Sequence, residues 1–135
     1  MDDLLVATFP SASNFGFINC SSKPSPVQGI IAKVPSIKGV EPGDVLTLFS
    51  KGYTRFDSEV PIPGTATQFE RVIGPGDVGQ PVDFIIGPYD TAIKPIRSGS
   101  LGVYYSVTRG GNTVTSPTSL VKITVELPGG GTCPE

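Results

Sequence analysis

The sequence predicts an all-β domain, an antiparallel sandwich of about seven strands. Its 135 residues include 17 Gly and 14 Pro, and both residue types disfavour the interior of a helix. Short apolar stretches are separated by turn residues at roughly every ten positions, which is the strand spacing of a sandwich or barrel. Hydrophobic residues make up 38% of the chain and charged residues 16%, a balance that favours a folded core over disorder. We therefore expect almost no α-helix.

Four strands are expected in the first two thirds of the chain. Residues 30–34 form an apolar stretch that Pro35 ends. After a turn at residues 41–44, the stretch 45–49 places Leu46 and Leu48 on one face and Val45 and Phe49 on the other. Apolar residues on both faces are typical of a central strand. The next two strands are expected at residues 69–73 and 82–86.

The last third of the chain shows the clearest alternation of apolar and polar residues. Odd-numbered positions from Leu101 to Val107 are apolar, and Tyr104 lies on the opposite, more polar face. A tight hairpin turn is expected at residues 109–112, because Gly110 and Gly111 tolerate positive φ. The final strand, residues 120–126, also alternates. The core is therefore predicted to contain Leu46, Leu48, Tyr105, Val107, Val121 and Ile123.

The chain divides into three parts by composition. Residues 1–28 are irregular, with one short strand expected near Phe17, and they are expected to pack on the sandwich. Residues 29–127 carry the regular strand pattern. Residues 128–135 form a Gly-rich tail that resembles a linker in composition.

Two cysteines lie near the two ends of the chain. We predict a disulfide between Cys20 and Cys133, because a buried thiol is not expected in a Gly/Pro-rich tail and an exposed free thiol is a liability. The alternative is two unrelated thiols. The bond would close a loop of about a hundred residues and indicates an oxidising compartment, outside the cell or at its surface.

Composition also argues against several classes of function. The net charge is −2 and the basic residues are scattered, so no basic stripe for nucleic acid is present. No apolar stretch approaches the ~18 residues of a membrane span. The sequence contains no His, which removes a His-activated nucleophile. The carboxylate pairs Asp57 with Glu59 and Asp77 with Asp83 are interpreted as solvated loop charges, and no enzymatic activity is predicted.

Several short motifs resemble the Ig-like repeat domains of large bacterial surface proteins of the adhesin or invasin type. They are GDVLTL at 43–48, VGQPVDF at 78–84, VYYSVTRGG at 103–111 and TSP at 115–117. The match covers residues 29–127 and departs where many such repeats carry a Trp, here Phe49 and Ser50. The resemblance implies an immunoglobulin-like sandwich and an extracellular spacer or adhesive module.

Candidate binding residues come from loop carboxylates and tyrosines. Oxygen ligands at loop tips suit calcium, although no loop has the spacing of a known calcium loop. Tyrosine rings can stack on sugars, but a tyrosine such as Tyr104, on the polar face of its strand, is expected to cover part of the sheet instead. No other cofactor is predicted. The candidate ligand-binding residues are Tyr53, Tyr89, Asp57 and Asp77, with Tyr104 on a polar face and Asp44, Glu59 and Asp90 as further loop carboxylates.

Three functional hypotheses remain at this point. The first is a non-catalytic structural or adhesive module, whose partners are other domains of the same protein or a cell-surface ligand. The second is a carbohydrate- or calcium-binding module. The third is an appendage subunit that assembles by strand addition at an open sheet edge. None involves nucleic acid or insertion into a membrane.

Overall fold

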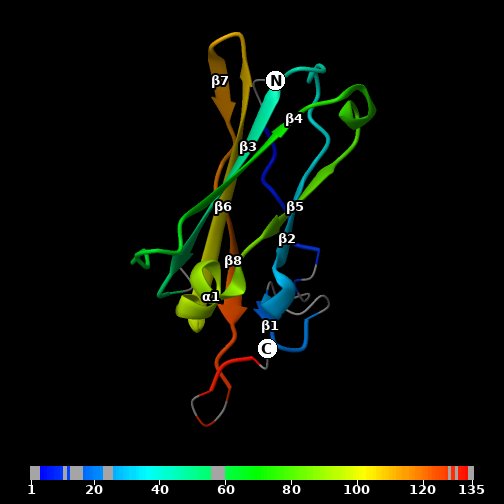
Figure 1. Cartoon of the computed structure of the whole chain (residues 1–135). Coiled ribbons are helices and arrows are strands. Elements are labelled where there is room, and N and C mark those ends of the chain that lie inside the picture. Colours follow the sequence, from blue (N-terminus) through cyan, green and yellow to red (C-terminus); the bar gives the residue numbers. More distant parts are fainter. Residues whose placement is uncertain are drawn as a thin grey trace.

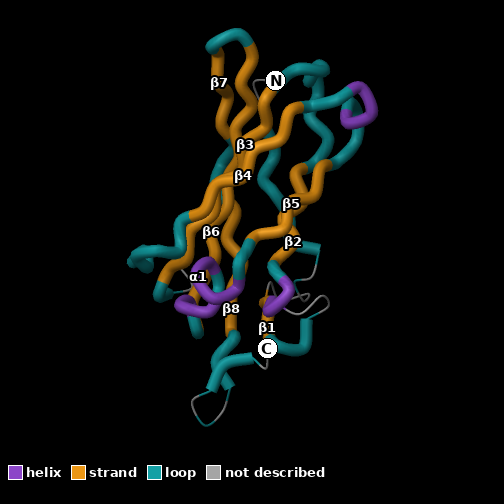
Figure 2. Tube along the Cα trace, in the orientation of Figure 1, coloured by secondary structure: helices purple, strands orange, loops and turns teal. Residues whose placement is uncertain are grey.

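The computed structural model describes residues 4–10, 12, 17–22, 26–55, 60–127, 129 and 131–133. In this part of the chain, strands form two sheets that face each other (Figures 1 and 2). The predicted all-β sandwich is confirmed. Eight strands occur in the described residues against about seven expected, and the only α-helix there is the four-residue α1 (Tyr89–Ala92). No helix in the described part is long and apolar enough to cross a membrane.

The larger sheet has the strand order β1-β8-β6-β3-β4, and β7 pairs with one end of β6. The central position predicted for the strand at 45–49 is confirmed, because β3 pairs with both β6 and β4. One pair departs from the antiparallel pattern, since β1 runs parallel to β8. The strands are β1 (Phe17–Asn19), β3 (Val45–Tyr53), β4 (Thr67–Val72), β6 (Ser98–Arg109), β7 (Asn112–Thr115) and β8 (Ser119–Thr124).

The smaller sheet contains β2 (Ile30–Val34) and β5 (Val82–Ile86), which pair antiparallel. The N-terminal segment adds a bridge on the other side of β2, where Thr8 and Lys33 exchange two backbone hydrogen bonds of 2.8–2.9 Å. Strand β2 therefore has a neighbour on each side, whereas β5 pairs only with β2 among the described residues. An immunoglobulin-like sandwich has this strand arrangement, with β2 and β5 in one sheet and β3, β4, β6 and β8 in the other.

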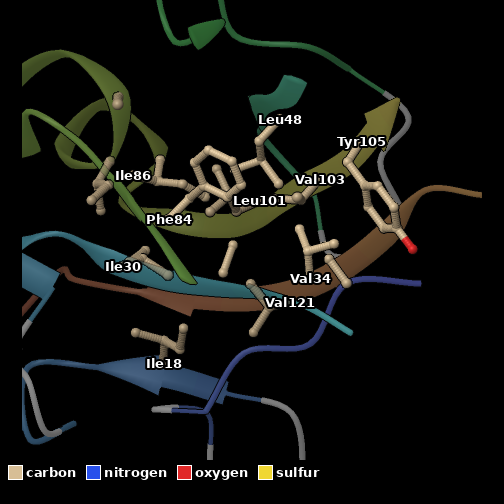
Figure 3. Close-up of a cluster of buried hydrophobic side chains, with 14 of the residues drawn as sticks. Ile18, Ile30, Val34, Leu48, Phe84, Ile86, Leu101, Val103, Tyr105 and Val121 are labelled. Carbon is tan, nitrogen blue, oxygen red and sulfur yellow. The ribbon is translucent and has the colours of Figure 1, made fainter. Parts of the chain in front are cut away.

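The core lies between the two sheets (Figure 3). All six residues predicted to be in the core are buried. From the larger sheet Leu48, Leu101 and Tyr105 face Val34 and Phe84 of the smaller one (Figure 3). The hydroxyl of Tyr105 donates a hydrogen bond to the Leu5 carbonyl, which ties the N-terminal segment to the sandwich. Burial raises the pKa of the Tyr105 phenol.

The hairpin predicted around the glycine pair is confirmed. Gly110 and Gly111 have φ of 55° and 88°, values that L-residues with a Cβ rarely adopt. The turn joins β6 to β7, a strand that the sequence pattern did not predict. Strands β7 and β8 pair with successive parts of β6, and residues 116–118 separate them. Only four alternating residues lie between the turn and Pro117, too few to give a clear period.

The predicted disulfide is present, with Cys20 and Cys133 bonded and their Cα atoms 5.3 Å apart. The premise that Cys133 lies in an exposed tail is wrong, because this residue is only 3% exposed. The chain after β8 folds back on itself: Glu126 and Thr132 form a bridge, and the Cys133 N–H donates to the Val125 carbonyl at 3.0 Å. Composition alone suggested a linker, but the fold-back buries the cysteine.

Candidate functional site

The outer face of the larger sheet carries an aromatic cluster. Because side chains alternate along β3, Phe49, Lys51 and Tyr53 point away from the core that Leu48 enters. The strand register places Phe49 between Gln68 of β4 and Tyr104 of β6. The residues that meet here are thus far apart in the sequence and are brought together by strand pairing.

Phe49 and Tyr104 stack against each other. Their ring centroids are 4.8 Å apart and their planes differ by 15°. Such cross-strand aromatic pairs stabilise a sheet, but no described strand or helix covers this pair, and Tyr104 remains 37% exposed. This position agrees with the expectation that Tyr104 covers part of the sheet.

Tyr53 lies on the same face, four residues beyond Phe49 along β3 and on the far side of Lys51. Its ring lies over Gly102, where an added Cβ would be 2.8 Å from the Tyr53 Cε2 atom. Gly102 pairs with Lys51 in the register of β3 and β6. The missing side chain at Gly102 therefore leaves a depression between Tyr53 and the Phe49–Tyr104 pair.

This depression is an open groove of about 410 Å³, within the ~300–1,000 Å³ range of small-ligand sites. Aromatic rings and small or polar side chains share its lining, and Lys51 is the only charged residue among the described residues that line it. The groove is lined by Phe49, Ser50, Lys51, Tyr53, Ala66, Thr67, Gln68, Gly102, Tyr104 and Thr118. We call this site the aromatic groove.

The β3–β4 connection holds one end of the aromatic groove in place. The buried Thr65 hydroxyl donates to the Ile62 carbonyl at 2.7 Å and accepts from the Gly52 N–H at 2.9 Å. Next to it, the Ser50 and Thr67 hydroxyls are in close hydrogen-bond contact. These bonds fix the start of β4 beside β3, so the groove is formed largely by well-anchored strand residues.

Asp77 serves a turn beyond the far end of β4 and is not in the aromatic groove. Its carboxylate accepts from the Gly74 N–H at 3.0 Å and from Arg71 Nη2 at 2.7 Å. These bonds lower the pKa of Asp77, the backbone N–H having the larger effect and Arg71 the smaller. The carboxylate thus has structural partners in a 3₁₀ turn (η2, Pro75–Asp77).

Asp44, in the GD turn before β3, is buried and paired with a single arginine. Arg109 holds it with two bonds of 2.7 and 2.8 Å, and the Glu41 N–H donates a third of 2.8 Å. Arg109 also donates to the Gly39 carbonyl at 2.8 Å. The Arg109 bonds lower the pKa of Asp44 against the opposing effect of burial. We call this pair the Asp44–Arg109 clamp, and it lies at the end of the sandwich beside the β6–β7 hairpin.

The remaining candidate residues do not lie together in the fold. Tyr89 was put forward for ligand binding, but it is only 5% exposed, because α1 turns its ring into the core. Asp57 and Glu59 lie outside the described residues. Asp90 is exposed at the start of α1. Within the described ranges, no group of three or more His, Cys, Asp or Glu is placed to hold a metal ion.

Of the four residues put forward for ligand binding, only Tyr53 lines the aromatic groove. Tyr104 lines it too. Sequence reasoning missed Phe49, Lys51, Thr67 and Gln68 as site residues. The available signal was the second apolar face of the strand at 45–49, which was attributed to a central position alone.

Comparison with protein families, with curated proteins and with solved structures gives no match for this chain.

Proposed function

We propose that this chain is a non-catalytic adhesive module of an extracellular bacterial surface protein, and that it binds its ligand at the aromatic groove. The observation that carries the proposal is the uncovered aromatic cluster on the outer face of the larger sheet. Exposed apolar patches framed by polar residues mark interaction sites in soluble proteins. Here Phe49, Tyr53 and Tyr104 are framed by Lys51 and Gln68.

The chemistry of the aromatic groove favours binding over catalysis. General acid–base chemistry requires a titrating group at the reacting atom, and in the described part of the chain no carboxylate lines the groove. Asp44 and Asp77 are engaged by Arg109 and Arg71 elsewhere in the fold. The lining supplies flat apolar surface, hydroxyls, an amide and one ammonium group, which are groups for contact and hydrogen bonding.

The extracellular and bacterial parts of the proposal have separate support. A disulfide persists in oxidising surroundings such as the cell exterior. The bacterial surface assignment rests on the motif resemblance described for residues 29–127. A spacer with no ligand of its own remains the competing form of this hypothesis.

An adhesion assay separates an adhesive module from a spacer. The domain is coated on beads at high density and tested on cell layers, matrix proteins and immobilised glycans. A Phe49→Ser/Tyr104→Ser variant should lose retention, whereas Ile85→Ser, which changes an exposed apolar residue of the smaller sheet, should retain it. Retention that survives the groove substitutions, or no retention on any surface, would overturn the proposal.

Self-assembly by strand addition is a second candidate, and it is favoured by the edge of β5, with which no described strand pairs. The backbone N–H and C=O of Lys33 bond to Thr8 and therefore point away from β5. Lys33 is paired with Asp83, so the N–H groups of Asp83 and, two residues on, of Ile85 point away from β2 toward the open edge. However, Pro81 precedes this strand and the exposed Asp83 lies within it, both features that protect edges. Sedimentation velocity tests this candidate. Polymers whose size grows with protein concentration, and which are absent in the Ile85→Pro variant, would support assembly.

A further inference from the structure

We infer that the ligand of the aromatic groove is a glycan carrying a carboxylate, with one acidic pyranose seated between Tyr53 and the Phe49–Tyr104 pair. The inference rests on the proposed function, because it names the ligand class of the same site. Three properties of the lining lead to it: flat apolar walls, uncharged hydrogen-bonding groups and a lysine that forms no ion pair with any described residue.

The walls match the apolar faces of a sugar ring. A pyranose presents flat patches of C–H groups, and aromatic rings bind such patches by dispersion and by their negative faces. Tyr53 lies on one side of the depression over Gly102, and the stacked Phe49 and Tyr104 lie on the other. A single ring can therefore contact aromatic carbon on two sides.

The uncharged polar lining matches the hydroxyls of a sugar. Thr118 contributes a hydroxyl and Gln68 an amide, and each of these groups can donate and accept. Adjacent sugar hydroxyls also donate and accept. A purely apolar ligand such as a lipid chain would cover these groups without satisfying them, which is costly.

The charge of the lining indicates an acidic ligand with few charges. Lys51 is exposed, and no ion pair joins it to any described residue, whereas Arg71, Arg97 and Arg109 are paired. No carboxylate of the described residues lines the aromatic groove to compete for it. One cation suits one carboxylate, while a polyphosphate chain needs a row of cations.

The test is a glycan array of uronic and sialic acid glycans beside their neutral counterparts, probed with the bead-displayed domain. We expect binding to the acidic glycans, weakened by salt because the ion pair is exposed. Lys51→Gln should reduce binding by about tenfold or more, as loss of a charged hydrogen bond does. Lys122→Gln is the matched control, because Lys122 lies over Phe17 on the same face but does not line the groove.

A second variant closes the aromatic groove without removing a ligand contact. Gly102→Ala places a methyl group against the movable Tyr53 ring and pushes this ring into the depression. It should abolish binding while the circular dichroism spectrum and melting temperature stay close to those of the wild type. This variant keeps the inference testable if the aromatic substitutions impair folding.

The outcomes distinguish the inference from the function on which it rests. Acidic-glycan binding that Lys51→Gln and Gly102→Ala remove supports both. Groove-dependent adhesion to a protein surface with a blank glycan array overturns the inference and leaves the proposed function. Binding to neutral glycans that is unchanged in Lys51→Gln overturns the acidic ligand. No groove-dependent adhesion of any kind overturns both.

Discussion

Leu48 and Phe49 are neighbours on β3, but the two faces of the larger sheet give them different surroundings. Leu48 is fully buried beneath the smaller sheet with Leu101 and Val103. Phe49 stacks on Tyr104 on the opposite face, where they line an open groove. The same strands thus carry a covered apolar face and an uncovered aromatic one.

The difference shows that an apolar strand face needs a partner. The partner can be another layer of the same protein or a separate molecule. On the inner face, β2 and β5 supply it, and burial of this face stabilises the fold. On the outer face, no described strand or helix covers the aromatic groove. The proposal of binding rests on this uncovered aromatic pair together with the groove beside it. Substitutions on the two faces should therefore have separable effects.

The largest effect is expected from the disulfide that closes the inner face at one end. The bond spans 113 residues, and a crosslink over a loop of that length contributes about 4–5 kcal/mol in the chain-entropy model. The Cys20→Ser/Cys133→Ser variant should lose about that much unfolding free energy, measured by urea denaturation. Groove binding by molecules that remain folded should not change. A variant as stable as the oxidised wild type would contradict this expectation.

The next effect is expected from a cavity in the inner face. Leu48→Ala removes fully buried methyl groups and should lower the unfolding free energy by about 2–5 kcal/mol. Ligand binding should be retained at temperatures where the variant is folded. Val72→Ala, on an exposed residue of β4, is the control and should change stability by no more than about 0.5 kcal/mol. Equal losses in the two variants would mean that the faces are not distinct.

The corresponding substitution on the outer face should affect binding more than stability. Phe49→Ser removes one ring of a partly exposed stacked pair and should lower stability by only about 1 kcal/mol. Bead retention should nevertheless fall to background. If Phe49→Ser destabilised the domain as much as Leu48→Ala while retention persisted, the outer face would be structural, and the adhesive proposal would fail.

The smallest effect concerns the clamp between Asp44 and Arg109 at the hairpin end of the sandwich. The folded-state pKa of Asp44 is lowered below its usual value of 3.8, chiefly by the Arg109 hydrogen bonds. The ionised form therefore stabilises the fold above that value, and this contribution is lost as the pH falls through the lowered pKa. Unfolding measured from about pH 7 to about pH 2 should show wild type and Asp44→Asn converging in stability at low pH.

Asp77 provides the control for this titration, because its pKa is lowered too. Asp77→Asn should remove a separate part of the acid-dependent stability and leave the part due to Asp44. A gap between wild type and Asp44→Asn that stays constant over the whole pH range would show that the clamp does not act through the ionised carboxylate.

Much of the fold was predictable from local patterns. The alternation from Leu101 to Val107 and the glycine pair after Arg109 fixed a strand and its turn, and both are present. Two cysteines at the ends of the chain were enough to predict their pairing. These features depend on the two-residue period of a strand and on the φ angles that glycine allows.

The aromatic groove was less predictable, for a physical reason. Tyr53 and Tyr104 were visible as aromatic residues, but Phe49 and Gln68 become neighbours of one another only through the register of β3 and β4. Tyr89 shows the opposite failure: its loop-like sequence context suggested exposure, and a short helix buries it instead. Neither strand register nor helix docking is recorded in a local pattern.

The sequence by itself determined the strand-rich class of this protein, its core residues, its hairpin turn and its disulfide, because each follows from local periodicity, turn chemistry or cysteine count. The tertiary structure alone decided which face of β3 is covered, where the chain end carries Cys133 and how Lys51 comes to lie opposite Gly102. Alternation tells which side chains share a face, but pairing between distant strands decides what that face meets.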